Sequence, residues 1–310
     1  MMSYLEYYSL NEEPFSNAPV TSKFYFNSSQ HSQALIRMMY AADSMKGLAV
    51  VVGDIGSGKT TLARRMLDQL PEEEYEAALL VIIHSAITAD WLLRRIATLL
   101  GVRDTTGDKP SLLTLIYEKL KEIYDQGKKT VVLVDEAQML QTREIMEEFR
   151  GLLNLEVPSS KLITFVFFGL LEIEEHLRLD EPLNQRVSTK YILKPLSADS
   201  TESYIKHRLH VAGSNKMLFS KEAVENIYKY SKGIPRLINT LCDNGLFEGF
   251  LLKKDLIGES IINNIARDLR FEPAARAEFK ETIAHSKEKI EQTEELDDID
   301  NILGKLTEKQ

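Results

Sequence analysis

The chain has 310 residues and a net charge of −9, with 44% hydrophobic and 27% charged side chains. This composition is typical of a globular protein with more than one domain, and its acidic balance argues against nucleic acid as the main partner. A single cysteine, Cys242, excludes an internal disulfide and a cysteine-rich zinc site, and fits a reducing compartment. Without a basic leader or a stretch approaching 18 apolar residues, we expect a cytoplasmic protein with no integral membrane segment, peripheral to the inner membrane at most through a partner.

Residues 1–30 are aromatic and irregular. They contain Pro14, Pro19 and the run Phe24-Tyr25-Phe26. Too few apolar residues recur there to build a separate core, so we expect an N-terminal arm that packs on the next domain. Packing in a core is the favoured role of the aromatic run, and contact with a nucleotide base is the alternative.

Residues 53–60 follow the phosphate-loop pattern G-x-x-x-x-G-K-[ST], between a predicted strand at 47–52 and a predicted helix at 59–70. In such a loop backbone N–H groups hold the phosphates, Lys59 reaches the β and γ phosphates, and the Thr60 hydroxyl binds Mg²⁺. The strand–loop–helix context disfavours the alternative of a glycine-rich turn with an unrelated lysine. The predicted nucleotide-binding residues are Gly53, Asp54, Ile55, Gly56, Ser57, Gly58, Lys59, Thr60 and Thr61.

An apolar run at 130–134 ends in two carboxylates, Asp135 and Glu136. At the end of a strand, Asp135 fits the Walker B role of holding the water shell of Mg²⁺ beside Thr60. Glu136 is placed to orient and polarise the water that attacks the γ-phosphate. A strand followed by solvated acids is the alternative. The acidic pair favours hydrolysis over a kinase reaction.

Strand and helix patterns alternate from residue 47 to about 194, after a helix at about 31–45. Strands are predicted at 47–52, 78–84, 130–135, 161–168 and 189–193, and helices at 59–70, 89–100, 111–126 and 142–154. Alternation of this kind predicts an α/β domain over 31–195, with a mostly parallel sheet and helices on both faces. Ligands bind such sheets at the C-terminal ends of the strands, where both motifs lie.

The strand pattern stops after residue 195. Helices are predicted at 198–212, 220–231, 235–252 and 256–270, which form a small all-helical domain over 196–271. Residues 272–310 are acidic, and too few of them are apolar to repay the entropy of ordering, so we expect a flexible tail or a lone solvated helix. The alternative is a partner-binding segment, because Ile299, Ile302, Leu303 and Leu306 have helical spacing.

The sequence resembles the ExeA/GspA-type AAA+ ATPases, which are linked to type II secretion and to some type IV pilus systems. The resemblance covers most of residues 1–271 and is carried by the phosphate loop and by segments 13–16, 134–138, 184–187, 204–209 and 233–239. It implies a P-loop NTPase of the AAA+, ASCE type with a helical lid, and ATP with Mg²⁺ as its ligands. Preference for ATP over GTP follows only from this resemblance.

The resemblance also implies roles for two arginines. Arg236 resembles the sensor 2 arginine that approaches the γ-phosphate from the lid; a surface arginine at a helix start is the alternative. Arg186 resembles an arginine finger that reaches the nucleotide of a neighbouring subunit; a surface salt bridge is the alternative. A finger requires a homo-oligomer for activity.

The sequence departs from the family in two respects. Relatives tend to have a polar residue after the fourth strand, the sensor 1 position, where this chain has Leu170; Thr164 lies too early. Full-length relatives often continue into a transmembrane helix and a peptidoglycan-binding domain, whereas this chain ends in the acidic tail. A direct role at the cell wall is therefore not carried over.

Three functions remain open from the sequence. The favoured one is an ATPase that drives or regulates assembly of a secretion or pilus-like envelope machine, through oligomerisation and a protein partner that the acidic tail is a candidate to bind. The second is a DNA-binding ATPase of the transposition-target-selector type, and the third a weakly hydrolysing, nucleotide-bound scaffold. The DNA alternative needs a basic face, for which the candidates, also interpretable as a solvated helix face, are Arg94, Arg95, Arg103, Lys119, Lys121, Lys128 and Lys129.

Overall fold

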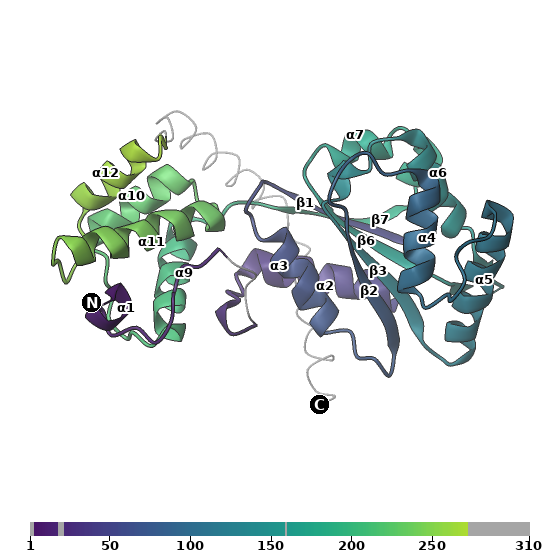
Figure 1. Cartoon of the computed structure of the whole chain (residues 1–310), viewed down its shortest axis with the longest axis horizontal. Coiled ribbons are helices and arrows are strands. Elements are labelled where there is room, and N and C mark those ends of the chain that lie inside the picture. The colour runs from purple at the N-terminus through teal and green to yellow at the C-terminus, as the bar shows by residue number, and fades with distance from the viewer. Residues whose placement is uncertain (1–2, 18–21, 159, 272–310) are drawn as a thin grey trace, which may run out of the picture.

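The computed structural model describes residues 3–17, 22–158 and 160–271. An α/β part built on a five-stranded sheet lies beside an all-helical part, and β7 leads from one to the other (Figure 1). The acidic tail at 272–310, with the predicted segment around Ile299, Ile302, Leu303 and Leu306, lies outside the described residues. Within the described ranges, no helix is both long and apolar enough to cross a membrane.

All neighbouring strands of the main sheet run parallel, in the order β2-β3-β6-β1-β7. The strands are β1 (Leu48–Gly53), β2 (Tyr75–Val81), β3 (Lys129–Asp135), β6 (Thr164–Gly169) and β7 (Val187–Leu193). Every residue of β1 and β6 is buried, as expected for central strands that are covered on both faces. Because β6 lies between β1 and β3, the ends of these two strands are one strand apart at the same edge.

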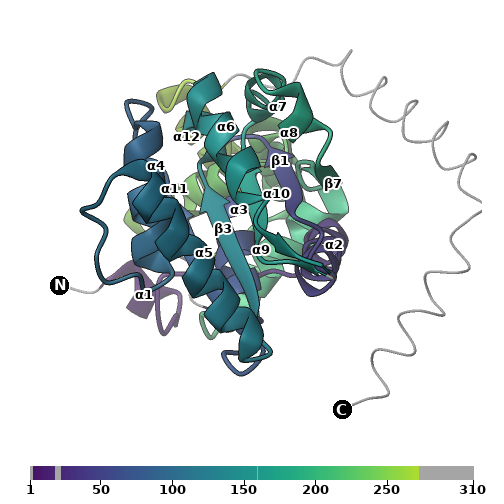
Figure 2. The same cartoon turned by 90° about the vertical axis from the view of Figure 1, so that its right-hand side faces the viewer.

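Alternate residues of the strands point into two separate cores, one on each face of the sheet. Helices lie on both sides of the sheet (Figure 2). Along β1, Val50 and Val52 face one core, whereas Ala49 and Val51 face the other. The first core is covered by α4 (Ala89–Leu99), α5 (Lys109–Asp125), α6 (Arg143–Leu152), α7 (Ile173–Leu177) and α8 (Glu181–Asn184); the second by α2 (Ser29–Asp43) and α3 (Lys59–Asp68). The fold class predicted from the sequence is confirmed.

Five short elements in the α/β part were not predicted, namely α7, α8 and three others. A 3-10 turn, η2 (Ala137–Met139), follows β3, and a small antiparallel hairpin joins β4 (Glu156–Val157) to β5 (Ser160–Lys161). The η2 turn positions a residue of the candidate site.

The helical part consists of α9 (Ala198–Val211), α10 (Lys221–Ser231), α11 (Pro235–Leu251) and α12 (Glu259–Asp268). Local sequence explains where these helices begin. The side chains of Ser197 and Ser220 cap α9 and α10, and Pro235 takes the first position of α11, where no backbone donor is needed.

The N-terminal arm packs mainly on the helical part, which corrects the expectation that it packs on the α/β domain. It contains α1 (Tyr4–Tyr7) and the 3-10 turn η1 (Ser22–Phe24). Tyr8, Leu10, Phe15 and Phe24 are buried in the core of the helical part. The physical reason is that α9 and α11 leave apolar side chains uncovered, and the arm buries them.

Candidate nucleotide site

The phosphate loop connects the buried strand β1 to the N-terminus of α3. Gly56 and Gly58 have left-handed backbone conformations, with φ of +80° and +101°. A Cβ at Gly58 would lie 2.9 Å from His31 Nε2, and one at Gly56 would lie 2.7 Å from the Cβ of Arg236. Glycine is therefore required at both positions by conformation and by space, and the loop presents the start of α3 to an anion.

Lys59, the first residue of α3, is 8% exposed and points back over the loop. Its Nζ donates to the carbonyl oxygens of Gly53 and Asp54, at 2.8 Å and 2.9 Å. Burial lowers the pKa of Lys59, while the carboxylates of Glu136, Asp135 and Asp54 oppose that shift. The ammonium is thus placed for the phosphate contact predicted from the sequence.

Asp135 lies at the end of β3 with 2% of its surface exposed. Burial is the main cause that raises the pKa of this carboxyl, and hydrogen bonds from the Thr60 hydroxyl and the Glu136 N–H oppose it. The structure therefore brings together the two residues predicted to hold Mg²⁺. A buried carboxylate beside a hydroxyl is a hard-oxygen pair that fits Mg²⁺ with its remaining waters.

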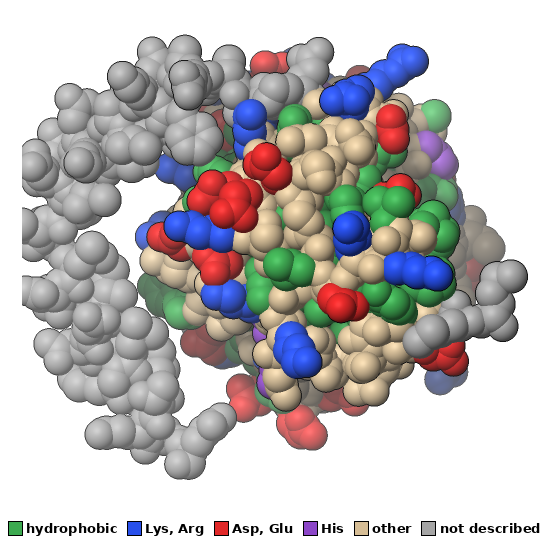
Figure 3. All heavy atoms as spheres, turned by 90° about the vertical axis from the view of Figure 1, so that its left-hand side faces the viewer, with side chains coloured by type: hydrophobic (Ala, Val, Ile, Leu, Met, Phe, Trp, Pro, Cys, Tyr) green, Lys and Arg blue, Asp and Glu red, His purple; other side chains and the backbone are tan. Residues whose placement is uncertain are grey.

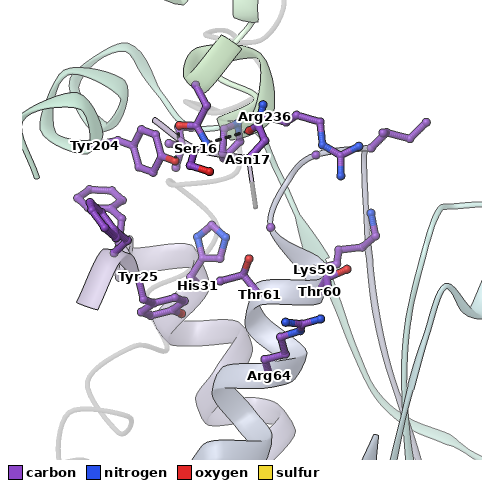
Figure 4. Close-up of a pocket in the computed structure, with 18 of the residues that line it drawn as sticks. Ser16, Asn17, Tyr25, His31, Lys59, Thr60, Thr61, Arg64, Tyr204 and Arg236 are labelled. Atoms are coloured by element: carbon purple, nitrogen blue, oxygen red, sulfur yellow. Dashed lines mark hydrogen bonds between the residues drawn. The ribbon is translucent and has the colours of Figure 1, made fainter. Parts of the chain in front are cut away.

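A cavity of about 520 Å³ opens beside the loop, between the α/β part and the helical part. In Figure 4, Lys59, Thr60, Thr61 and Arg64 lie along the start of α3, while Tyr204 and Arg236 lie across from them on the helical part. This size is within the range of small-molecule sites. The predicted loop residues that line the cavity are Ile55, Gly56, Gly58, Lys59, Thr60 and Thr61, and Glu136 lines it as well.

The remaining predicted loop residues support the cavity from behind. Gly53 and Asp54 hold Lys59 through their carbonyls. Ser57 is 1% exposed, and its hydroxyl has no hydrogen-bond partner in the described part of the chain. Packing in a core holds for Phe24, which is buried in the helical part, and for Phe26, which packs against that core. Phe24, Tyr25 and Phe26 all line the cavity, so contact with a nucleotide base stays a prediction.

The structure separates the two candidate arginines. Arg236, at the start of α11, lines the cavity, and its backbone N–H donates to the Gly56 carbonyl at 3.3 Å. Arg186 precedes β7, whose first residue pairs with Leu48 at the beginning of β1. It therefore lies at the opposite edge of the sheet from the loop, about 17 Å away at the rise of a β-strand. Its guanidinium makes no ion pair with any described residue.

Sequence analysis missed two residues that contact the motifs. His31 on α2 lies under the loop: its Nδ1 is 2.6 Å from Ser28 Oγ and its Nε2 is 3.2 Å from the Ser57 carbonyl. Burial lowers the pKa of His31, which favours a neutral ring that donates from Nε2 to that carbonyl. The only signal in the sequence is a histidine near the start of the predicted helix at 31–45.

Gln138 is the second missed residue. It lies beside Leu170, which occupies the sensor 1 position where relatives tend to have a polar residue. Leu170 lines the cavity, and Thr164 lies at the far end of β6, where its hydroxyl accepts from the Gly47 N–H. Gln138, from η2, bonds both Glu136 and Leu170. Its place two residues after the acidic pair is the signal that sequence reasoning had available.

Comparison with known proteins agrees with this geometry. Residues 42–177 match the AAA domain family. Over 250 residues the chain is 36% identical to general secretion pathway protein A of Aeromonas hydrophila. The aligned region covers 80% of this chain and 45% of that protein. The chain thus spans less than half the length of this relative.

Solved structures share the fold. The Aeropyrum pernix ORC2 protein aligns with a TM-score of 0.64 at 14% identity, over 87% of this chain and 74% of that chain. The Drosophila ORC bound to DNA aligns with a TM-score of 0.63 at 17% identity, over 87% of this chain and 67% of that chain. At these identities the likeness shows the fold alone.

Fold and site together are those of an AAA-type P-loop protein, and the match to the AAA domain family covers residues 42–177. Within this class, the resemblance to the ExeA/GspA-type proteins is confirmed by the Aeromonas hydrophila homologue.

Proposed function

We propose that this chain is a Mg²⁺-dependent ATPase whose turnover drives or regulates assembly of a secretion or pilus-like envelope machine. The observation that carries the proposal is the convergence of Lys59, Glu136 and Arg236 on one cavity, with Asp135 and Thr60 joined beneath it. Phosphoryl transfer needs positioning and charge stabilisation, which this set supplies. Because the proposed substrate, ATP, is supplied in the cytoplasm, we propose that the nucleotide site lies there.

The proposed roles follow from this geometry. The loop and Lys59 bind the phosphates, and Thr60 and Asp135 hold Mg²⁺, which offsets the charge of the phosphates when bound. Glu136 activates the attacking water, and Arg236 contacts the γ-phosphate from the helical part, which acts as a lid. The proposal includes the division of the chain into arm, α/β domain, lid and tail after residues 30, 195 and 271.

Two features support action on other proteins. The homologue is named for the general secretion pathway. The helical part also exposes apolar side chains at the end of α11 and just after it, namely Phe247, Leu251, Leu252 and Leu256, each more than half exposed. Apolar groups that gather on a surface mark candidate interfaces. We propose that they, the acidic tail or both contact a partner or another copy of the chain.

Two substitutions test the enzymatic proposal. Glu136→Gln is expected to keep ATP binding and reduce turnover by roughly 10²- to 10⁴-fold, because the general base is lost. Lys59→Ala is expected to weaken both binding and turnover. Nucleotide titrations and steady-state phosphate release measure the two effects. Glu118→Gln, on the exposed surface of α5, is the matched control, and wild-type turnover by Glu136→Gln would contradict the proposal.

The DNA-binding alternative has less support. Four of its seven candidate cations are paired on the protein itself: Arg94 with Asp90 at 2.7 Å, Lys119 with Glu122 at 3.0 Å, Lys121 with Asp125 at 2.7 Å, and Lys129 with Asp43. On the face of the helical part shown in Figure 3, basic and acidic side chains are interspersed. Salt-sensitive, ATP-dependent retardation of DNA would favour this alternative. Turnover near the uncatalysed background would favour the scaffold.

A further inference from the structure

The side chain of Gln138 connects the acidic pair at the end of β3 to the end of β6. Its Nε2 donates to Glu136 Oε2 at 2.6 Å, and its Oε1 accepts from the Leu170 N–H at 3.1 Å. These two partners fix the orientation of the amide, because a carboxylate only accepts and a backbone N–H only donates. Gln138 is 7% exposed, so water competes little for either bond.

The backbone of Glu136 is in an uncommon conformation. It has a φ of +56° and a ψ of 38°, the left-handed conformation that residues other than glycine rarely adopt. Its N–H donates to Asp135 Oδ1 at 3.0 Å, and its carboxylate is held by Gln138. Strained conformations of this kind persist where the surroundings hold them, and they concentrate at functional sites.

The end of β6 leaves little room for a polar side chain of its own. A Cβ at Gly169 would lie 3.2 Å from both the backbone N and the Oε1 of Gln138. The next residue, Leu170, lines the cavity with an apolar side chain. The polar group at this point of the cavity is thus supplied from the turn after β3.

We propose that Gln138 is a positioning residue, which aims the Glu136 carboxylate at the attacking water and takes the place of the polar residue lacking at Leu170. The inference rests on the proposed ATPase function. With Oε2 held by Gln138, Oε1 of Glu136 is free to accept a proton from water. The water oxygen bonds to the γ-phosphorus, the bond to the bridging oxygen of ADP breaks, and the proton passes to Glu136.

Removal of the amide tests the role in positioning. Gln138→Ala is expected to lower kcat by roughly tenfold to a hundredfold, a part of what a positioned general base contributes. The affinity for ATP should stay within about twofold, because within the described ranges the side chain of Gln138 bonds Glu136 and Leu170 and makes no hydrogen bond to the loop or to Lys59. A loss of ATP affinity as large as the loss of kcat would indicate a disrupted site and overturn the inference.

A near-isosteric substitution adds a readout that a structural role would not move. Gln138→Glu keeps an acceptor for the Leu170 N–H but places a second carboxylate against Glu136. Two carboxylates at this distance share a proton, so turnover should fall at a higher pH on acidification than in the wild type. An unshifted pH–rate profile would overturn the inference.

Gln126→Glu is the matched control for this profile. The amide of Gln126 also donates to a carboxylate, that of Glu122 at 3.3 Å, but on the exposed end of α5. Its profile should match that of the wild type. If turnover of the wild type depends on Glu136 but Gln138→Ala keeps the kcat of the wild type, the inference is overturned and the proposed function stands. Absence of Glu136-dependent turnover in the wild type would overturn the proposed function and the inference with it.

Discussion

At the scale of single residues, the buried carboxylate of Asp135 destabilises the folded protein when no nucleotide is bound. The same carboxylate is proposed to hold Mg²⁺. Burial raises its pKa above 3.8, the value of an unperturbed aspartate. The folded state therefore holds this proton more tightly than the unfolded state. The resulting stabilisation is fully present below about pH 3.8 and is lost as the pH rises through the folded pKa. At neutral pH the charged side chain lowers the free energy of unfolding of the nucleotide-free protein.

Asp135→Asn is expected to raise that free energy at pH 7 by roughly 0.5–2 kcal/mol, because the buried charge is removed. The gain over the wild type should shrink as the pH falls through the pKa of Asp135. The variant should also lose the stabilisation that ATP with Mg²⁺ gives the wild type. Denaturant unfolding at several pH values, with and without Mg²⁺ and ATP, measures both effects.

Asp68→Asn, at the exposed end of α3, is the control for this substitution. It should change the free energy of unfolding by no more than about 0.5 kcal/mol. An Asp135→Asn protein that is less stable than the wild type at pH 7 would contradict the argument from burial.

At the scale of elements, Arg208 of α9 holds the arm on the helical part. It is 2% exposed, and its guanidinium donates to the carbonyls of Pro14 and Ser16 and lies 4.7 Å from the ring centre of Phe24. No carboxylate pairs with it in the described ranges. Carbonyl dipoles and the Phe24 ring therefore stabilise the buried charge, although burial still lowers the pKa of Arg208.

Arg208→Ala is expected to lower the free energy of unfolding by roughly 2–4 kcal/mol, because buried carbonyls lose a charged donor. Release of the arm removes Ser16, Asn17 and Tyr25 from the wall of the cavity, so KM for ATP should rise more than kcat falls. Hydrogen exchange of residues 4–17 and steady-state kinetics measure the two effects. Arg267→Ala, on the exposed face of α12, is the control, and unchanged exchange in the arm would contradict the prediction.

The long elements were predictable because each has a periodic apolar face. The helix predicted at 89–100 spans Ala89–Leu99, and the strand predicted at 130–135 spans Lys129–Asp135. The short helices α7 and α8 have too few residues to establish a period. The position of the arm was not predictable for a different reason, since it depends on Arg208 and other residues nearly two hundred positions away.

The residues of the candidate site likewise fall into those that were predictable from the sequence and those that were not. The loop and the acidic pair are local motifs, so the sequence predicts them residue by residue. Gln138 acquires its role only where Leu170, 32 positions later, meets it at the end of β6. His31 likewise contacts Ser57, 26 positions later, through tertiary packing. Contacts of this kind leave no periodic signal in a single sequence.

At the scale of the whole molecule, the position of Arg186 bears on assembly. Arg186 and the phosphate loop of the same chain lie at opposite ends of the strands. The reason is that β7 begins beside the start of β1, whereas the loop follows the end of β1. An arginine finger at this place can serve only the nucleotide of another copy. If Arg186 is such a finger, specific activity should climb with protein concentration as oligomers form, which turnover and light scattering on the same samples would show.

Mixing two inactive variants tests this arrangement directly. Arg186→Ala and Glu136→Gln should each lose most activity alone, the former by roughly 10³-fold or more. In a mixed oligomer, an Arg186→Ala subunit keeps Glu136 and can receive Arg186 from a Glu136→Gln neighbour. At equal amounts, random assembly completes about a quarter of the sites, so the mixture should recover up to about that share of the wild-type rate.

Arg178→Ala, exposed after α7, is the control and should stay active alone. Full activity of Arg186→Ala by itself would exclude the finger, whereas an inactive mixture that still forms mixed oligomers would exclude its action between subunits.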